Sequence, residues 1–392
     1  MKSAYESDYT EYPMISSRER VRLALNHEET GRPPQDLGTS CNTSITKIAY
    51  CNLLEYLGLP IESEPPFLSQ DMQVVEIEDS LLERLHIDTR GLHANPPDND
   101  RSEVLSDQSY RDEWGISFRA ATVEGKLLYY DVEGYPLSSI TSVEEIERYL
   151  WPDPLDPGRT RGLKDKARRM RAETKFAIFG HMGDTSIFQA CTLLRGMEQF
   201  LIDLVTERPL VQALMEKVLE IQSIKMARFL DEVGEHIDVV GIGDDFAGQS
   251  GPLISPDLFR TMVKPYLKRY CDIIKSKTDA PIHLHSCGAV MDLLPDFIEL
   301  GIEIINPVQV SARGMDPAVL KEKYGKDLCF WGGIDTQNVL PYGTPEEVKE
   351  EVARISGVFG KNGGYVLNPV HNLQPDVPPE NIVAMYETFF DE

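Results

Sequence analysis

Eight short apolar segments recur along the chain, and each ends in a polar or glycine-rich turn. Their length and their bounding turns are typical of β-strands, and most are followed by a stretch with helical periodicity. Because strands that alternate with helices pair in parallel, the pattern predicts an α/β fold, and eight such units close most naturally into a (β/α)8 TIM barrel. A doubly wound open sheet is the alternative. The segments are residues 34–38, 87–92, 176–180, 237–243, 282–286, 302–307, 328–333 and 365–369.

Strong helix-start signals lie between several of these segments. A capping residue followed by proline precedes each of the expected helices 258–268, 318–324 and 348–358. Before the first strand, Ser16 and Glu19 have the spacing of a capping box, which predicts a helix over residues 18–26. We expect this N-terminal helix to be a lid on one end of the barrel.

One connection is too long to be a simple link between a strand and a helix. Residues 95–175 contain two alternating segments, 115–121 and 126–131, and this pattern predicts a hairpin insertion after the second strand. We expect the insertion to cover part of the mouth of the barrel. Residues 16–392 are accordingly expected to form one barrel domain, preceded by a disordered or loosely attached segment 1–15.

The net charge and the cysteines bear on the cellular location of the protein and on its binding partners. The formal net charge is −25, which argues against binding to nucleic acid or to an anionic membrane, because both would repel the chain. The six cysteines have no framework spacing, the N-terminus is unlike a signal peptide, and no apolar run is long enough to span a bilayer. We therefore expect a cytoplasmic, soluble protein.

The segment around residue 285 carries side chains that bind metals. His283, His285 and Cys287 are spaced two apart, so an extended chain directs them to one side. Imidazole and thiolate are zinc ligands, and a catalytic zinc normally takes three ligands from the protein. His371, which follows the eighth expected strand, is the natural third ligand beside His285 and Cys287. The alternatives are core packing for the His-x-Cys pair and a loop or substrate-contacting role for His371.

Polar side chains follow nearly every expected strand, and in a TIM barrel the carboxyl ends of the strands form the active site. We expect catalytic roles for His181, Asp244 and Asp245. Other polar residues at or near strand ends include Asp88, Arg90 and Asp184. For any one of these residues the alternative is helix capping, and Asp244 or Asp245 could also hold a ligand histidine. Substrate binding is expected of Asp36, Asn306, Gln309, Asp335 and Asn372.

Several short motifs stand along the chain. They are Arg-Glu-Arg-Val at 18–21, Arg-Pro-Pro-Gln-Asp-Leu-Gly at 32–38, Asp-Asp at 244–245, Gly-Pro-Leu-Ile-Ser-Pro at 251–256, His-Ser-Cys-Gly at 285–288, Trp-Gly-Gly-Ile-Asp at 331–335 and Asn-Pro-Val-His-Asn at 368–372. Together they resemble the uroporphyrinogen decarboxylase superfamily, over nearly the whole chain from about Ser16. Within it, the chain is more similar to the corrinoid-linked methyltransferases, which include methylcobalamin:coenzyme M methyltransferases and O- or N-demethylating relatives, than to the decarboxylases.

The resemblance implies a TIM barrel whose His-x-Cys-Gly motif binds one zinc ion per chain. It also implies methyl transfer between a small methyl donor or acceptor and the cobalt of a corrinoid, such as methylcobalamin, carried by a separate corrinoid protein. His181, Asp244 or Asp245 would then manage protons. The oligomeric state stays open, with a homodimer as one possibility.

Two departures from the family pattern bear on the substrate. True decarboxylases bind propionate groups through an arginine-containing segment, and the corresponding residues 36–42 contain no arginine. Thiol-methylating members resemble one another in a C-terminal cysteine ligand, where this chain has His371. A zinc held by two histidines and one cysteine carries less negative charge from its ligands than a zinc held by one histidine and two cysteines. It is therefore the stronger Lewis acid of the two, which favours an oxygen or nitrogen substrate over coenzyme M.

Two other hypotheses compete with methyl transfer. The first is a metal-free decarboxylase of another carboxylated aromatic, in which Asp36 or Asp88 stabilises a protonated intermediate. The second is a binding protein that kept the barrel without catalysis. Metal content separates the decarboxylase from the methyltransferase.

Overall fold

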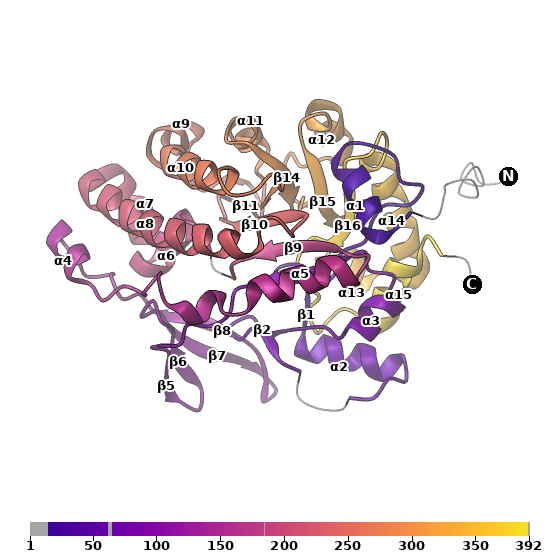
Figure 1. Cartoon of the computed structure of the whole chain (residues 1–392), viewed down its shortest axis with the longest axis horizontal. Helices are drawn as coiled ribbons and strands as arrows, with labels where there is room; N and C mark the ends of the chain where they lie inside the picture. The colour runs from indigo at the N-terminus through magenta and orange to yellow at the C-terminus, as the bar shows by residue number, and fades with distance from the viewer. Residues whose placement is uncertain (1–14, 62–64, 184, 391–392) are drawn as a thin grey trace.

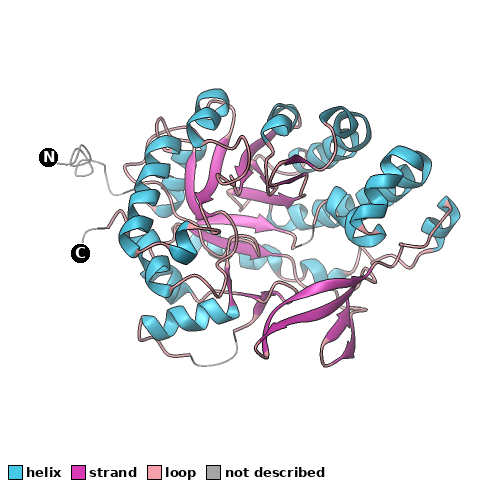
Figure 2. Ribbon diagram, turned by 180° about the vertical axis from the view of Figure 1, so that it is seen from behind, coloured by secondary structure: helices cyan, strands magenta, loops and turns pink. Residues whose placement is uncertain are grey.

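A curled sheet of seven parallel strands lies at the centre of the molecule, in the order β16-β15-β14-β13-β10-β9-β4. The computed structural model describes residues 15–61, 65–183 and 185–390, and Figures 1 and 2 show this sheet surrounded by helices. The expected parallel α/β architecture is therefore confirmed. The strands are β4 (Thr89–His93), β9 (Ala177–His181), β10 (Val239–Gly243), β13 (Ile282–His285), β14 (Ile302–Asn306), β15 (Cys329–Ile334) and β16 (Tyr365–Pro369).

The first expected strand, residues 34–38, is the exception. It forms a single parallel bridge between Gln35 and Leu367 of β16. On its other side the Gln35 carbonyl accepts a hydrogen bond of 2.9 Å from the Asp88 amide, next to β4. Pro34 has no N–H to donate, and Gly38 turns the chain at a φ of 87°. The segment thus closes the gap between β16 and β4 without becoming a regular strand.

Helices cover the outside of the sheet, and several begin where the sequence predicts. Thr344 and Glu347 form a capping box at the start of α14, with Pro345 as the first helical residue. The helices are α1 (Ser17–Leu25), α2 (Lys47–Tyr56), α3 (Asp79–Arg84), α4 (Val143–Arg148), α5 (Leu163–Glu173), α6 (Phe188–Arg195), α7 (Met197–Thr206), α8 (Arg208–Val233), α9 (Pro256–Leu258), α10 (Lys264–Lys275), α11 (Leu294–Glu299), α12 (Pro317–Tyr324), α13 (Val339–Tyr342), α14 (Pro345–Phe359) and α15 (Pro379–Glu387). A π-helical turn joins α9 to α10 at Phe259–Val263, and 3-10 turns lie at Pro157–Thr160 and Met291–Leu293.

The N-terminal helix α1 lies at the amino-terminal ends of the strands. The Arg18 amide donates to the carbonyl of Lys175, just before β9, and the Gly364 amide, just before β16, donates to the carbonyl of Ala24. The Cys329 thiol at the start of β15 donates to the Leu25 carbonyl. The helix therefore closes the end of the barrel opposite to the carboxyl ends of the strands, where barrel enzymes have their active sites.

The long connection after β4 contains an antiparallel sheet of four strands in the order β5-β6-β7-β8. Its longest pair, β7 and β8, occupies the expected hairpin. This sheet stands beside the barrel in Figures 1 and 2. The remaining small sheets pair β1 with β3 and β2, and β11 with β12. The strands are β1 (Ile45–Thr46), β2 (Phe67–Ser69), β3 (Val74–Val75), β5 (Glu103–Ser106), β6 (Ser109–Arg111), β7 (Ser117–Val123), β8 (Lys126–Gly134), β11 (Ala247–Gly248) and β12 (Gly251–Pro252).

Large side chains fill the interior of the barrel. A separate buried cluster contains Phe179, Val239, Ile304, Trp331 and Val366, from five different strands. His283 packs edge-on against Phe179 and Trp331, with ring centroids 4.9 Å and 5.3 Å away. The barrel centre is therefore a packed core, and the polar chemistry is left to its carboxyl end.

Some expectations from the sequence concern residues outside the described ranges or can be checked only within them. The segment expected to be loosely attached, 1–15, lies outside the described residues except for Ile15, and so does Asp184. No helix within the described ranges has the length and apolar character needed to cross a membrane.

Candidate metal centre

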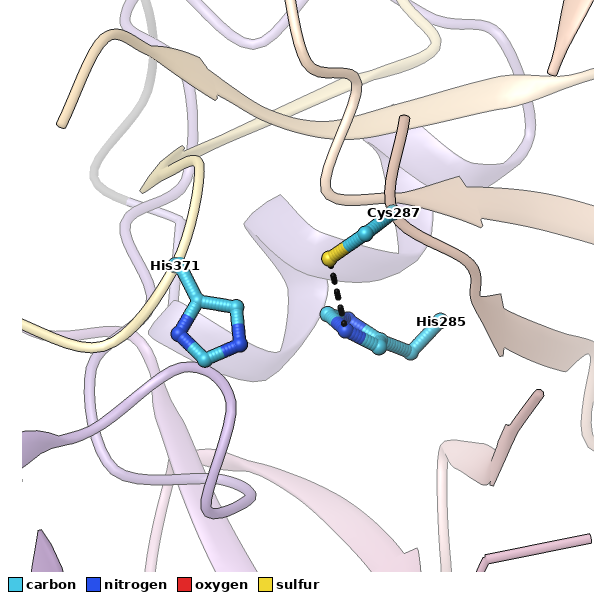
Figure 3. A group of neighbouring side chains, drawn as sticks. All are labelled: His285, Cys287 and His371. Atoms are coloured by element: carbon cyan, nitrogen blue, oxygen red, sulfur yellow. Dashed lines mark hydrogen bonds between the residues drawn. The ribbon is translucent and has the colours of Figure 1, made fainter. Parts of the chain in front are cut away.

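Three side chains at the carboxyl end of the barrel face one another. His285 ends β13, Cys287 follows it, and His371 lies in the loop after β16. One ligand atom from each lies within 4.8 Å of the others. Figure 3 shows the two rings and the sulfur converging on a common point. The structure thus brings together the three residues that the sequence suggests as metal ligands.

The distance between the Cys287 sulfur and the His285 ring fits a zinc site. The Cys287 sulfur lies 3.4 Å from His285 Nε2. In a zinc site with Zn–N of about 2.0 Å and Zn–S of about 2.3 Å, neighbouring ligand atoms are about 3.5 Å apart. Imidazole nitrogen and thiolate sulfur are also both ligands that suit zinc. These residues therefore fit a zinc ion with a fourth position open.

Asn306 fixes the tautomer of His285. The Asn306 amide group donates to the Trp331 carbonyl over 2.9 Å, so its oxygen faces His285 Nδ1 at 2.5 Å. Nδ1 must then carry the proton, and Nε2 presents its lone pair toward Cys287 and His371. Asn306, expected to bind substrate, is instead a partner of a candidate ligand.

Two acceptors hold the loop that carries Cys287. Its amide donates to Asp245 Oδ1 over 2.8 Å, and the next amide, of Gly288, donates to Gln309 Oε1 over 2.9 Å. Burial raises the pKa of the Cys287 thiol well above its usual value, and the Asp245 carboxylate raises it further. A thiol in this position becomes a thiolate readily only beside a cation, so binding of a metal here would be coupled to ionisation of Cys287.

His371 is kept neutral by its surroundings. Burial, and next the neighbouring His285 ring, lower the pKa of His371 to about 4. A neutral imidazole is the form that binds a metal. The adjacent Asn372 donates through Nδ2 to the Cys41 carbonyl over 3.2 Å. Asn372 therefore ties the His371 loop to the segment that follows residue 38.

Asp244 performs the capping role that the sequence left as its alternative. Its carboxylate accepts hydrogen bonds from the amides of Ile187, Phe188 and Gln189 at the start of α6. Burial raises the pKa of Asp244 to about 7, although these three amides favour its charged form. The residue is 1% exposed. Asp244 therefore positions α6, whereas its neighbour Asp245 is the carboxylate that contacts the candidate metal centre.

Two other expected substrate-binding residues bond to protein groups: Asp36 joins neighbouring strands, and Asp335 stabilises its own loop. Asp36 is fully buried and accepts hydrogen bonds from Thr89 of β4 and from the indole of Trp331 in β15. Asp335 accepts from the Gln337 amide and from the side chain of Asn338 in its own loop. The carboxylates of both residues are thus engaged by protein groups.

His181, the last residue of β9, lines a cavity of about 290 Å³. Its Nδ1 accepts a hydrogen bond of 2.9 Å from the Gly183 amide. His93, the last residue of β4, lines the same cavity, and the two ring centroids are 6.5 Å apart. His93 was not predicted as a site residue, because the expected strand ended one residue earlier. Nor were Lys225, Arg159 and Glu113 predicted, since no sequence motif surrounds these cavity-lining residues.

Fold and site together define a TIM-barrel-like protein with a candidate metal centre of two histidines and one cysteine at the carboxyl end of its strands. The model of the uroporphyrinogen decarboxylase family matches residues 127–390. The chain belongs to this family.

Individual relatives are more distant. Uroporphyrinogen decarboxylase from Chlorobium phaeovibrioides is 29% identical over 161 residues, which are 40% of this chain and 42% of that protein. The Pelodictyon phaeoclathratiforme enzyme is 28% identical over 192 residues, 47% of this chain and 50% of that protein. The chain thus matches at most about half the length of these curated relatives.

A solved structure covers far more of the chain. A methyltransferase from Methanosarcina mazei matches 95% of this chain and 98% of its own, with a TM-score of 0.64 and 20% sequence identity. At this identity the likeness establishes a shared fold.

Proposed function

We propose that the protein is a zinc-dependent methyltransferase. It moves a methyl group between a small O- or N-methylated substrate, or another small carrier, and the cobalt of a corrinoid protein. The observation that carries the proposal is the convergence of His285, Cys287 and His371 at the carboxyl end of the barrel. The solved structure of similar fold is itself named a methyltransferase, which is in line with this proposal.

A zinc ion bound by these three residues would supply a Lewis acid for the oxygen or nitrogen that carries the methyl group. The chain itself prepares the ligands. Asn306 holds Nε2 of His285 in the form that can bind, and the acceptors Asp245 and Gln309 fix the backbone on both sides of Cys287. Because two of the three ligands are neutral imidazoles, the site keeps a net positive charge when occupied, which suits a substrate heteroatom that gains negative charge.

Proton handling falls to Asp245 and His181 in this proposal. In demethylation the bond between methyl and heteroatom breaks, a methyl–cobalt bond forms, and the heteroatom takes up a proton. Asp245 is half-buried next to Cys287 and His371, and His181 lines the neighbouring cavity. Asp244 contributes indirectly, by holding α6.

The corrinoid would come from a partner protein that docks at the carboxyl end of the barrel. The insertion 95–175 contributes residues to the cavity beside His181, so it would shape access to the site.

A decarboxylase is the second candidate, because the curated relatives carry that name. The two acids expected to stabilise the protonated intermediate, Asp36 and Asp88, are poorly placed for this role, however. Asp88 precedes β4 and forms a bidentate ion pair with Arg32, with contacts of 2.7 Å and 3.1 Å. That position is at the amino end of the barrel. Asp36 lies in the packed interior.

A methyl-transfer assay tests the proposal. Zinc-loaded protein is mixed with cob(I)alamin, in place of the partner's corrinoid, and with methoxylated or N-methylated compounds, and methylcobalamin formation is followed by absorbance. We expect formation with the wild type and none with Cys287→Ala. Equal activity of the metal-free protein, or metal-free release of carbon dioxide from a carboxylated aromatic, would contradict the proposal.

A further inference from the structure

A glutamine beside the candidate metal centre keeps an unused hydrogen-bond donor. Gln309, in the loop after β14, accepts the Gly288 amide through Oε1 over 2.9 Å. Its Nε2 makes no hydrogen bond within the described part of the chain, and it is not sealed in by protein atoms. The rest of the side chain is enclosed, since only 7% of the residue is exposed. The Gly288 bond fixes the amide, so Nε2 is an oriented donor next to the Cys287 loop.

The other residues expected to bind substrate are already engaged. In each of them both polar atoms of the side chain are hydrogen-bonded to described protein groups, and these residues are Asp36, Asn306, Asp335 and Asn372. Such bonds hold the chain itself in place. Gln309 is therefore the member of this set that keeps a polar atom for a ligand, and that atom is a donor.

A strained residue directs Gln309 toward the metal centre. Val308 has a φ of 54°, in the left-handed region that β-branched residues rarely adopt, and it is buried. Before this turn, Asn306 contacts the ring of His285. After it, Gln309 contacts the Gly288 amide. Strain of this kind persists where the surrounding structure enforces it, and it clusters at ligand sites. The loop after β14 is therefore shaped to the candidate metal centre.

A donor at this position distinguishes oxygen from nitrogen. An ether or phenolate oxygen that gives one lone pair to a metal keeps another, which can accept from an amide N–H. An amine nitrogen has a single lone pair, so nothing remains to accept the bond once that pair is used. Any N–H on the amine would also face the N–H of Gln309. Leaving a donor unpaired in the complex weakens binding, so Gln309 favours an oxygen compound.

We propose that Gln309 Nε2 donates to the oxygen of the methyl-group substrate. The substrate is then an O-methyl compound, such as the methyl ether of a phenol, rather than an N-methyl amine. This inference rests on the proposed function for the role of the metal. In demethylation the carbon–oxygen bond breaks and its electron pair stays on the oxygen, while the methyl carbon bonds to the electron pair of cobalt(I) in the partner's corrinoid. Negative charge grows on the oxygen before it takes up a proton, and the Gln309 bond strengthens with that charge.

A matched pair of probes tests the donor by calorimetry on protein supplied with zinc. 4-Methylphenol and 4-methylaniline have the same shape and differ in the oxygen or nitrogen that the site meets. We expect the wild type to bind the phenol at least about tenfold more tightly. In Gln309→Met this preference is expected to fall about tenfold, because the donor is lost. Gln337→Met, an exposed substitution in the loop after β15, is the control and is expected to keep the preference.

Gln309→Glu separates the donor from the support of the Cys287 loop. Its carboxylate can still accept the Gly288 amide, but an acceptor replaces the donor. We therefore expect the preference to reverse toward the aniline, whose N–H groups can donate to a carboxylate. The zinc content of each variant shows whether the loop is intact. If Gln309→Met loses its zinc, the reversal in Gln309→Glu decides the question.

Equal binding of both probes by the wild type, or a preference for the phenol that survives both substitutions, would overturn the inference. The outcome is separable from that of the proposed function. A wild type without zinc that still prefers the phenol through Gln309 would uphold the donor and reject the zinc-dependent methyltransferase. A zinc-loaded wild type without the preference would do the reverse.

Discussion

Asn306 accepts a hydrogen bond from His285, with 2.5 Å between its Oδ1 and the ring Nδ1. The Trp331 carbonyl fixes the orientation of the Asn306 amide, so the bond sets which nitrogen of His285 is protonated. The two residues lie at the ends of adjacent strands, paired in register. The pairing of the two strands thus places Asn306 beside the candidate ligand His285.

Asn306→Leu is expected to weaken zinc binding by about 10- to 100-fold, because His285 loses the group that fixes its tautomer and ring orientation. Competition with a chromophoric chelator measures this affinity. Asn52→Ala, an exposed substitution in α2, is the control and should leave it unchanged. An unaltered affinity in Asn306→Leu would show that the hydrogen bond does not prepare the ligand.

Gly288→Ala is expected to disturb the Cys287 loop. Gly288 has a φ of 89°, and a Cβ there would lie 2.6 Å from the Gly248 carbonyl oxygen and 2.7 Å from that of Ala247. Because both neighbours are backbone atoms, the loop must shift, and we expect loss of zinc together with a lower melting temperature. Gly248→Ala, which has open space for its methyl group, is the matched control. Equal zinc content in the two variants would rule out this account of Gly288.

Asp36 is expected to make stability depend on pH. Burial raises its pKa in the folded state to about 6, from a value of 3.8 in the unfolded chain. Below the lower value both states hold the proton. As pH rises further, only the folded state keeps it, so stability relative to Asp36→Asn is lost until the pH exceeds the folded pKa. The full difference corresponds to about 3 kcal/mol.

Urea unfolding of the wild type and Asp36→Asn from about pH 4 to about pH 7 measures this difference. Asp244, whose pKa is also raised, is present in both proteins, so its contribution to the pH dependence cancels in the comparison. Two unfolding free energies that change in parallel with pH would contradict the expected titration of Asp36.

Asp238 anchors α1 at the amino end of the barrel. Its carboxylate pairs with Arg22 and Arg171 at 2.9 Å and 2.8 Å and accepts the Ile178 amide at 2.9 Å. Asp238→Ala leaves these partners unsatisfied, and we expect the free energy of unfolding to fall by about 3 kcal/mol, with faster proteolysis of α1. Zinc content should not change, since the candidate centre lies at the other end.

Asp231→Ala is the control for this substitution, because Asp231 is exposed and pairs with Lys277 at the surface. We expect it to cost about 1 kcal/mol or less. A similar loss of stability in both variants would show that the Asp238 cluster has no special role in holding α1.

The strand pattern was informative because a parallel strand is buried on both faces and appears as a continuous apolar run. The runs around Ile282 and Tyr365 became β13 and β16. The segment 34–38 resembles such a run, but Pro34 and the turn at Gly38 limit it to one bridge.

For the site, the sequence predicted which side chains lie near one another at the strand ends. The alternation of β13 predicts that His285 and Cys287 point to the same side, and the closure of a barrel predicts that His371 lies near them. The partners of a polar group could not be read from the chain. Asp244 and Asp245 are adjacent, yet one caps α6 and the other contacts Cys287. Lys225 meets Glu113 through tertiary packing, which leaves no local signal.

Zinc analysis of the purified protein beside Cys287→Ala tests the central proposal most directly. The account predicts close to one zinc per chain in the wild type and its loss in the variant, since Cys287 supplies the only thiolate among the three candidate ligands. A correctly folded wild type that takes up no zinc, or a Cys287→Ala variant that binds zinc equally well, would contradict the proposed metal centre. The decarboxylase would then be the better-supported function.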